Sequence, residues 1–140
     1  MADDTRILLV DDEREFTDTL MKRLRRRNVD VIGAGSGEEA LDLLSREQVD
    51  IVILDVRMPG IDGLETLRRI KQDHSRIEVI LLTGHANVEA AAEGMELGAF
   101  DYLMKPMDID ELLYKVEDAQ KSRQLREKKL KALKSNRGAE

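Results

Sequence analysis

The chain has 140 residues and a formal net charge of −6, which suits one compact domain with a single hydrophobic core. It contains no cysteine, which excludes a disulfide framework and a thiolate metal site and favours a reducing compartment. The N-terminus shows no signal-peptide pattern, and no apolar run approaches the roughly 20 residues that span a bilayer, so we expect a cytoplasmic protein with no membrane partner.

Charge is distributed unevenly along the chain. Residues 121–140 hold eight Lys or Arg residues against Glu127 and Glu140, so this segment carries +6 and residues 1–120 carry −12. We therefore expect a domain at residues 5–120 and a basic helical tail, or truncated linker, at residues 121–140. Direct nucleic-acid binding by the tail is disfavoured, because the acidic body opposes approach to phosphates and no aromatic residue is interleaved.

Five short apolar runs have the length and composition of β-strands. They lie at residues 7–10, 29–32, 51–54, 79–82 and 100–103. Between them the apolar spacing becomes helical, as one-sided stripes at three places indicate: Phe16, Leu20 and Leu24; Leu64, Leu67 and Ile70; Val88, Ala91 or Ala92, and Met95. Strands and helices therefore alternate along the chain through short connections.

Capping residues support this division. Ser36 with Glu39, and Asp108 with Glu111, have the spacing of a helix N-cap and its N3 partner, and Gly98 suits the end of a helix. Short connections between strands and helices imply right-handed crossovers and a parallel sheet covered on both faces. We predict an α/β domain with a five-stranded doubly wound parallel sheet of order 2-1-3-4-5 and five helices, the last one extended.

Three acidic residues stand at the ends of predicted strands. Asp11 and Asp12 follow the first strand, and Asp55 follows the buried third strand, where a carboxylate is unfavourable. In this strand order the carboxyl ends of the first and third strands are neighbours, at the place where such sheets bind ligands. Two carboxylates about 4 Å apart repel by on the order of 4 kcal/mol at an effective dielectric near 20, so a cation is expected among them.

The chemistry of this edge indicates phosphoryl transfer. Oxygen ligands without cysteine favour a hard ion, and Mg2+, which keeps several waters and takes one or two carboxylates, fits best. The fourth strand ends in Thr83 and the fifth leads to Lys105, so a hydroxyl and an ammonium join the acids. Acid, metal, hydroxyl and ammonium together form a phosphoryl-transfer site.

Four sequence pieces at strand ends resemble the receiver domain of two-component response regulators, in order and in spacing. They are VDD at 10–12, LDVRMPGIDG at 54–63, LLTGHA at 81–86 and FDYLMKP at 100–106, and the resemblance covers about residues 5–120. It implies that Asp55 is the phosphoacceptor, which forms an acyl phosphate. It also implies Mg2+ held by Asp12, Asp55 and the backbone carbonyl of Arg57, with Asp11 acting through water or orienting the site.

The resemblance assigns further roles. Thr83 and Lys105 would bind phosphoryl oxygens, and Tyr102 would be the aromatic residue whose side chain rotates in the switch. The Lys105–Pro106 bond is expected to be cis, a form that is accessible for the peptide bond before a proline. Arg57 and His85 occupy the two positions that modulate the rate of dephosphorylation.

The function implied is a phosphorylation switch that controls a partner or an output domain missing from this chain. A histidine kinase or phosphotransfer protein would donate the phosphoryl group, and the domain would catalyse only its own phosphorylation and dephosphorylation. The sparse apolar residues of the tail predict a projecting connector helix and a monomer or weak dimer, because Arg123 and Arg126 would interrupt a coiled-coil seam.

Other interpretations remain open. Asp11 and Asp12 could simply precede a helix N-terminus, where acids suit the dipole, and the basic residues at 22–27 suit a helix C-terminus. A magnesium-dependent hydrolase of small phosphates would need a second acid near Asp55, whereas position 57 is Arg. A receiver-like scaffold that takes no phosphate would have no use for the complete set of acids, Thr83 and Lys105.

Overall fold

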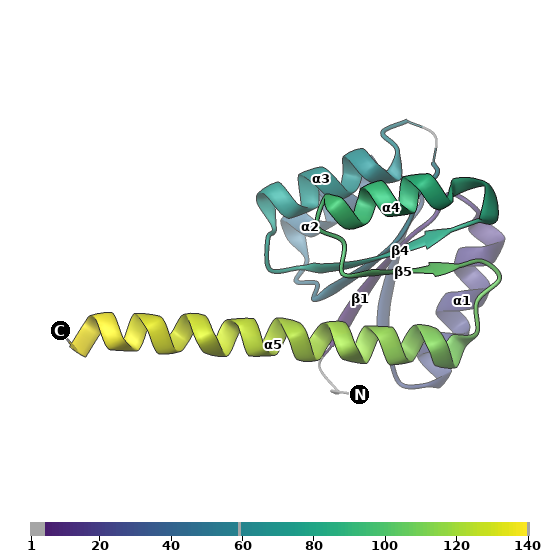
Figure 1. Cartoon of the computed structure of the whole chain (residues 1–140). Helices are drawn as coiled ribbons and strands as arrows, with labels where there is room; N and C mark the ends of the chain where they lie inside the picture. The colour runs from purple at the N-terminus through teal and green to yellow at the C-terminus, as the bar shows by residue number, and fades with distance from the viewer. Residues whose placement is uncertain (1–4, 59, 140) are drawn as a thin grey trace.

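The computed structural model describes residues 5–58 and 60–139, apart from the side chains of His85 and of residues 137–139. The sheet lies between two layers of helices (Figure 1). In chain order the elements are β1 (Arg6–Val10), α1 (Arg14–Arg26), β2 (Asp30–Ala34), α2 (Gly37–Arg46), β3 (Ile51–Asp55), α3 (Gly63–Asp73), β4 (Glu78–Thr83), the 3-10 helix η1 (His85–Asn87), α4 (Val88–Glu96), β5 (Asp101–Met104) and α5 (Ile109–Ala139).

The sheet has the predicted topology. Its order is β2-β1-β3-β4-β5, and every neighbouring pair is parallel. The strands differ from the apolar runs by one or two residues at their ends, as where β4 includes Glu78 and Thr83. Main-chain pairing continues there although the side chains become polar. β3 is buried over its whole length, because it is the central strand and helices cover both faces of the sheet.

Alternate residues of each strand face opposite sides of the sheet and fill two cores. One core includes Leu8 and Leu54 and is covered by α2, α3 and α4. The other includes Ile7 and Ile53 and is covered by α1 and α5. The strand ends are thereby held between two packed layers, which gives the loops at the carboxyl edge a rigid base.

The predicted helix ends are largely found. The Ser36 hydroxyl accepts a hydrogen bond from the backbone N–H of Glu39 at 3.1 Å, and Gly98 follows α4 with a φ of +108°. Asp108 caps α5 differently from the prediction, because its carboxylate accepts from the N–H of Asp110 at 3.0 Å, one residue earlier than Glu111. The physical role is the same, since either bond satisfies an otherwise unpaired N–H of the first turn.

Helix α5 continues far beyond the sheet and forms the long projection in Figure 1. Its first turns are held by Leu112 and Val116, which are fully buried. Beyond Gln120 the contacts of the helix with the body are ionic: Arg123 Nη2 lies 2.9 Å from a carboxylate oxygen of Asp50, and Arg126 Nη2 lies 3.0 Å from one of Glu78. The helix therefore remains attached to the body for two turns beyond Gln120 before it projects.

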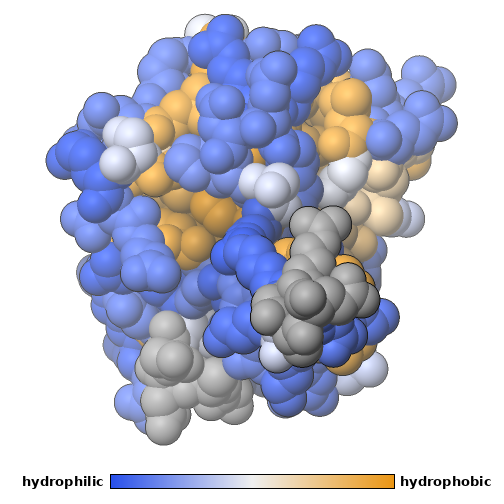
Figure 2. All heavy atoms as spheres, turned by 90° about the vertical axis from the view of Figure 1, so that its left-hand side faces the viewer, coloured by the Kyte–Doolittle hydropathy of each residue, from blue (hydrophilic) through white to orange (hydrophobic). Residues whose placement is uncertain are grey.

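The view along α5 from its C-terminal end shows the amino ends of the strands. Hydrophilic side chains cover most of this face, with apolar surface between them (Figure 2). Leu125, Leu130 and Leu133, in the C-terminal half of α5, are exposed. Among the described residues, no helix is both long enough and apolar enough to cross a membrane.

Candidate functional site

Three carboxylates meet at the carboxyl edge of the sheet. β1 and β3 are neighbours with Val10 opposite Leu54, so the residues that end or follow these strands come together. One oxygen from each of Asp11, Asp12 and Asp55 lies within 4.8 Å of the other two. Asp11 and Asp55 are buried, whereas Asp12 is exposed. The acids therefore converge, as the strand order predicts.

Lys105 enters this cluster from the loop after β5. Its ammonium donates a hydrogen bond to Asp11 at 2.7 Å and lies 3.8 Å from an oxygen of Asp55. Its backbone N–H donates to the carbonyl of Thr83 at 2.8 Å, which ties the loop to β4, and the Lys105–Pro106 bond is cis, as expected. Burial alone would lower the pKa of Lys105, but the bond to Asp11 and the charge of Asp55 raise it above its ordinary value.

The carboxyl group of Asp55 is in an unfavourable place for a negative charge. Burial, followed by the nearby charge of Asp11, raises its pKa to about 6, although Lys105 and the N–H of Arg57 act in the opposite direction. That N–H donates to Asp55 at 3.3 Å. A cation beside Asp55 would relieve the unfavourable charge, since opposite charges favour the ionised carboxylate.

The remaining predicted residues differ in their exposure and in their contacts. Thr83 is buried, and its hydroxyl lies 3.2 Å from the carbonyl oxygen of Gly84 and 3.1 Å from that of Asn87, so it faces the start of α4. Tyr102 is 41% exposed, and the Arg57 side chain is also exposed. His85 begins η1, but its side chain lies outside the described part of the chain.

The acidic cluster fits a magnesium ion. Its members are three carboxylates, with no histidine among them, and Mg2+ prefers oxygen ligands. Both carboxylate oxygens of Asp11 already accept a hydrogen bond, one from Lys105 and the other from the backbone N–H of Glu13 at 2.9 Å. Asp12 and Asp55 are therefore better placed to contact a metal directly, and the exposure of Asp12 leaves room for the waters that Mg2+ retains.

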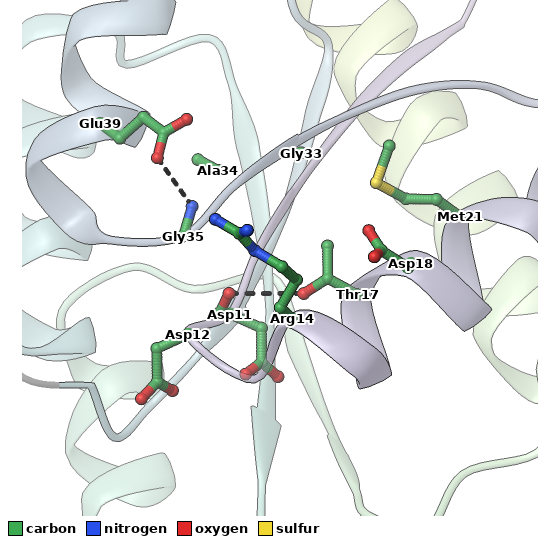
Figure 3. Close-up of a pocket in the computed structure, with 10 residues that line it drawn as sticks. All are labelled: Asp11, Asp12, Arg14, Thr17, Asp18, Met21, Gly33, Ala34, Gly35 and Glu39. Carbon is green, nitrogen blue, oxygen red and sulfur yellow. Dashed lines mark hydrogen bonds between the residues drawn. The ribbon is translucent and has the colours of Figure 1, made fainter.

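A polar pocket of about 360 Å3 adjoins the cluster between α1 and the end of β2. Figure 3 shows the Arg14 guanidinium reaching across it toward Gly35, while the carboxylates of Asp11 and Asp12 point away from it. The Thr17 hydroxyl donates to the backbone carbonyl of Asp11 at 3.3 Å, which anchors the turn that carries both acids. This pocket was not predicted from the sequence.

Two contacts of the site were not predicted from the sequence. Gly63, at the start of α3, approaches the main chain so closely that a Cβ there would lie 2.3 Å from the carbonyl oxygen of Asp55. Phe16, which the apolar stripe places only in a helix, lies against the ammonium of Lys105. A glycine at a strand–helix junction could have signalled the first contact, but no local pattern identifies the second.

Comparison with known proteins gives a consistent result. The family model for the response regulator receiver domain matches residues 7–117. The DNA-binding transcriptional regulator NtrC of Klebsiella pneumoniae is 40% identical over 111 residues, which cover 79% of this chain and 24% of that protein. The transcriptional regulatory protein CpxR of Escherichia coli (strain K12) is 43% identical over 111 residues, which cover 79% of this chain and 47% of that protein. The chain thus spans about a quarter to a half of these relatives.

Solved structures agree with the sequence relatives. A response regulator receiver domain protein from Clostridium thermocellum has a TM-score of 0.83 at 32% identity, covering 86% of this chain and 98% of that one. The receiver domain of NtrX from Brucella abortus has a TM-score of 0.78 at 32% identity, covering 82% and 98%. With most of its residues matched by the family model, the chain belongs to the response regulator receiver domain family, the regulatory phosphoacceptors of bacterial two-component signalling.

Proposed function

We propose that Asp55 is the phosphoacceptor of this receiver domain. A phosphohistidine on a histidine kinase or phosphotransfer protein is the donor. An oxygen of the Asp55 carboxylate attacks phosphorus as the P–N bond to the donor imidazole breaks, the bonding pair stays on that nitrogen, and the product is an acyl phosphate. The observation that carries this proposal is Asp55 at the end of a buried strand, with Lys105 3.8 Å away and two more acids around it.

The surrounding residues act by position and charge. Asp12, Asp55 and the backbone carbonyl of Arg57 would hold Mg2+, with Asp11 orienting the site, and the ion would supply positive charge that offsets repulsion between the acids and the incoming phosphoryl group. Lys105 leaves Asp11 to bind a phosphoryl oxygen on Asp55. Such preorganised charges account for most of the catalysis in phosphoryl transfer, where the protein has little covalent chemistry to perform.

Phosphorylation is read out through Thr83 and Tyr102. In this structure the Thr83 hydroxyl faces carbonyl oxygens at the start of α4. A phosphoryl oxygen on Asp55 offers it a charged acceptor, which makes a stronger hydrogen bond. When Thr83 turns toward that acceptor, the β4–α4 loop loses a contact and the exposed ring of Tyr102 gains space to move inward. Switches of this kind act by biasing an element with two arrangements.

The signal ends by hydrolysis of the acyl phosphate within the same domain. Arg57 and His85 occupy the two positions that set the rate of this hydrolysis. The domain is catalytic only toward itself, and a monomer or weak dimer passes the signal to a partner or to an output domain. Control of transcription is one such output, since two of the relatives are named as transcriptional regulators.

A labelling experiment tests the acceptor assignment. The chain is incubated with Mg2+ and a small phosphodonor, and the adduct is measured by intact mass. One base-labile phosphoryl group is expected on the parent, none on Asp55→Asn, and much less on Asp12→Ala. Asp73→Asn, which removes an exposed acid away from the cluster, should label like the parent.

Two results would contradict the proposal. Equal labelling of Asp55→Asn and the parent would place the acceptor elsewhere. Rapid multiple turnover of a generic phosphate ester, without a stable adduct, would favour the magnesium-dependent hydrolase over the switch.

A further inference from the structure

The ammonium of Lys105 has an aromatic neighbour as well as acidic ones. Its Nζ lies 4.4 Å from the centroid of the Phe16 ring, in the first turn of α1. On its other sides are oxygens of Asp11 at 2.7 Å, Asp55 at 3.8 Å and Glu13 at 3.9 Å. Phe16 itself is half-buried and packs against the core between the sheet and α1. The position of its ring is therefore fixed by packing against this core.

A ring and a carboxylate hold an ammonium in different ways. A carboxylate accepts a directional hydrogen bond, whereas a ring face attracts the cation through its quadrupole and leaves its N–H donors free. The attraction becomes stronger as the cation loses water, and the Lys105 side chain is only 21% exposed. The ammonium can therefore change its hydrogen-bond acceptor while it stays in contact with Phe16.

Phosphoryl transfer requires such a change of acceptor. Lys105 is bound to Asp11 in the present structure and is too far from Asp55 for a hydrogen bond. To meet a phosphoryl oxygen on Asp55 it must release one acceptor and take another without being drawn into solvent or fixed by Glu13. The ring lies beside the ammonium at the place where this exchange occurs.

We propose that Phe16 is a positioning residue for Lys105: its ring face retains the ammonium over the acceptor site while the hydrogen bond passes from Asp11 to the phosphoryl group. The inference rests on the proposed role of Asp55 and deepens it. In this role Phe16 acts through Lys105.

The first experiment compares variants that keep or remove the ring. Phe16→Leu keeps an apolar side chain but removes the quadrupole, and Phe16→Tyr retains a ring face. With a small phosphodonor and Mg2+, we expect Phe16→Leu to lower the rate of labelling at saturating donor by about 3- to 30-fold, the range that corresponds to a partly desolvated cation–π contact. Affinity for fluoroberyllate, which mimics the phosphoryl group, should fall in parallel, and Phe16→Tyr should restore both.

A matched control separates positioning from packing. Phe100 is the chain's other phenylalanine, is also half-buried, and packs against the same core, but it lies at the amino end of β5. Phe100→Leu should therefore label within about twofold of the parent. Thermal unfolding checks each variant, and Phe16→Met replaces Phe16→Leu if the latter does not fold.

A double-mutant cycle tests whether Phe16 acts through Lys105. In a Lys105→Met background, Phe16→Leu should cause no further loss beyond about twofold. An equal loss with and without the ammonium would overturn the proposal, as would unchanged labelling in Phe16→Leu or failure of Phe16→Tyr to restore it. Absence of labelling in the parent chain is a different result, since it would overturn the acceptor assignment itself.

Discussion

At the scale of single residues, the proposed acceptor Asp55 occupies a place that is unfavourable for its own charge. Asp55 is placed where burial and a second acid oppose its charge, and its pKa is raised to about 6. The same placement makes the carboxylate a good partner for a cation and for a phosphoryl group, because each neutralises part of the charge. Functional groups are often held in positions that do not favour the folded state.

This placement predicts a pH-dependent gain in stability for Asp55→Asn without Mg2+. The folded-state pKa of Asp55 lies above its ordinary value of 3.8, so between about pH 4 and pH 6 the folded state binds more protons than the unfolded state. Stability of the parent relative to Asp55→Asn therefore falls as the pH rises through this window and stays lower above it. The variant should be more stable by about 1 to 2 kcal/mol at pH 7, after allowance for solvent screening.

Urea unfolding in the presence of a chelator measures this difference. The gap between the two proteins should be largest above pH 6 and should shrink toward pH 4. Asp73→Asn, at an exposed position, should stay within about 0.5 kcal/mol of the parent throughout. A constant gap at all pH values would show that its cause is not the charge of Asp55.

At the scale of elements, α5 is joined to the sheet by two kinds of contact. Buried Leu112 and Val116 hold its first turns, and ion pairs hold the turns beyond Gln120. Arg123 binds Asp50, which precedes β3, and Arg126 binds Glu78, which begins β4. The helix is thus attached to the amino ends of the two strands that end in Asp55 and Thr83. We propose that the stable unit extends to about residue 127.

The two arginines should differ in their contribution to stability. The Arg123 and Asp50 side chains are 15% and 13% exposed, so Arg123→Ala leaves a nearly buried carboxylate without its main cation and should cost about 1 to 3 kcal/mol. Arg126→Ala should cost less, about 0 to 1 kcal/mol, because Lys71 remains 3.0 Å from Glu78 and Arg126 is 45% exposed.

Chemical denaturation of both variants gives this comparison directly. Arg46→Ala, which removes an exposed ion pair within α2, is the control and should change stability by no more than about 0.5 kcal/mol. An Arg126→Ala variant less stable than Arg123→Ala would reverse the expected order and would mean that burial of the pair does not decide its value.

At the scale of the whole molecule, Asp55 and α4 are linked through β4. Thr83 ends β4, and its hydroxyl faces two carbonyl oxygens between β4 and α4. The backbone N–H of Lys105 donates to the carbonyl of Thr83, so β5 is part of the same connection. A ligand at Asp55 that binds Thr83 would therefore change the environment of α4 and β5 more than that of α2.

Fluoroberyllate with Mg2+ should reveal this path in the folded chain. We expect amide signals of Thr83, Tyr102 and α4 to shift, because Thr83 exchanges its carbonyl acceptors for the ligand. Signals of α2, which packs against the same face of the sheet but is not joined to Thr83, should move little. Shifts confined to the residues next to Asp55 would show that the site does not control α4, and Thr83→Ala should confine them in this way.

Much of the fold followed from local pattern. Apolar runs of strand length, helical stripes and capping residues such as Ser36 act over a few residues, and short parallel crossovers allow few topologies. Once the strand order was predicted, Asp11 and Asp55 had to lie on neighbouring carboxyl ends, so the convergence of the acids was also predictable. Strand ends were less accurate, since main-chain pairing at Glu78 and Thr83 does not depend on an apolar side chain.

By itself, then, the sequence determined the alternation of strands and helices, the sheet order and the convergence of the acids at one edge of the sheet. Each of these depends on neighbouring residues or on a rule of topology. Only the tertiary structure decided which groups became partners. Lys105 is bound to Asp11 with Phe16 against its ammonium, and Arg123 is bound to Asp50, between elements far apart in the chain. Such pairs depend on how helices and loops are placed relative to the sheet, and no local pattern encodes that geometry.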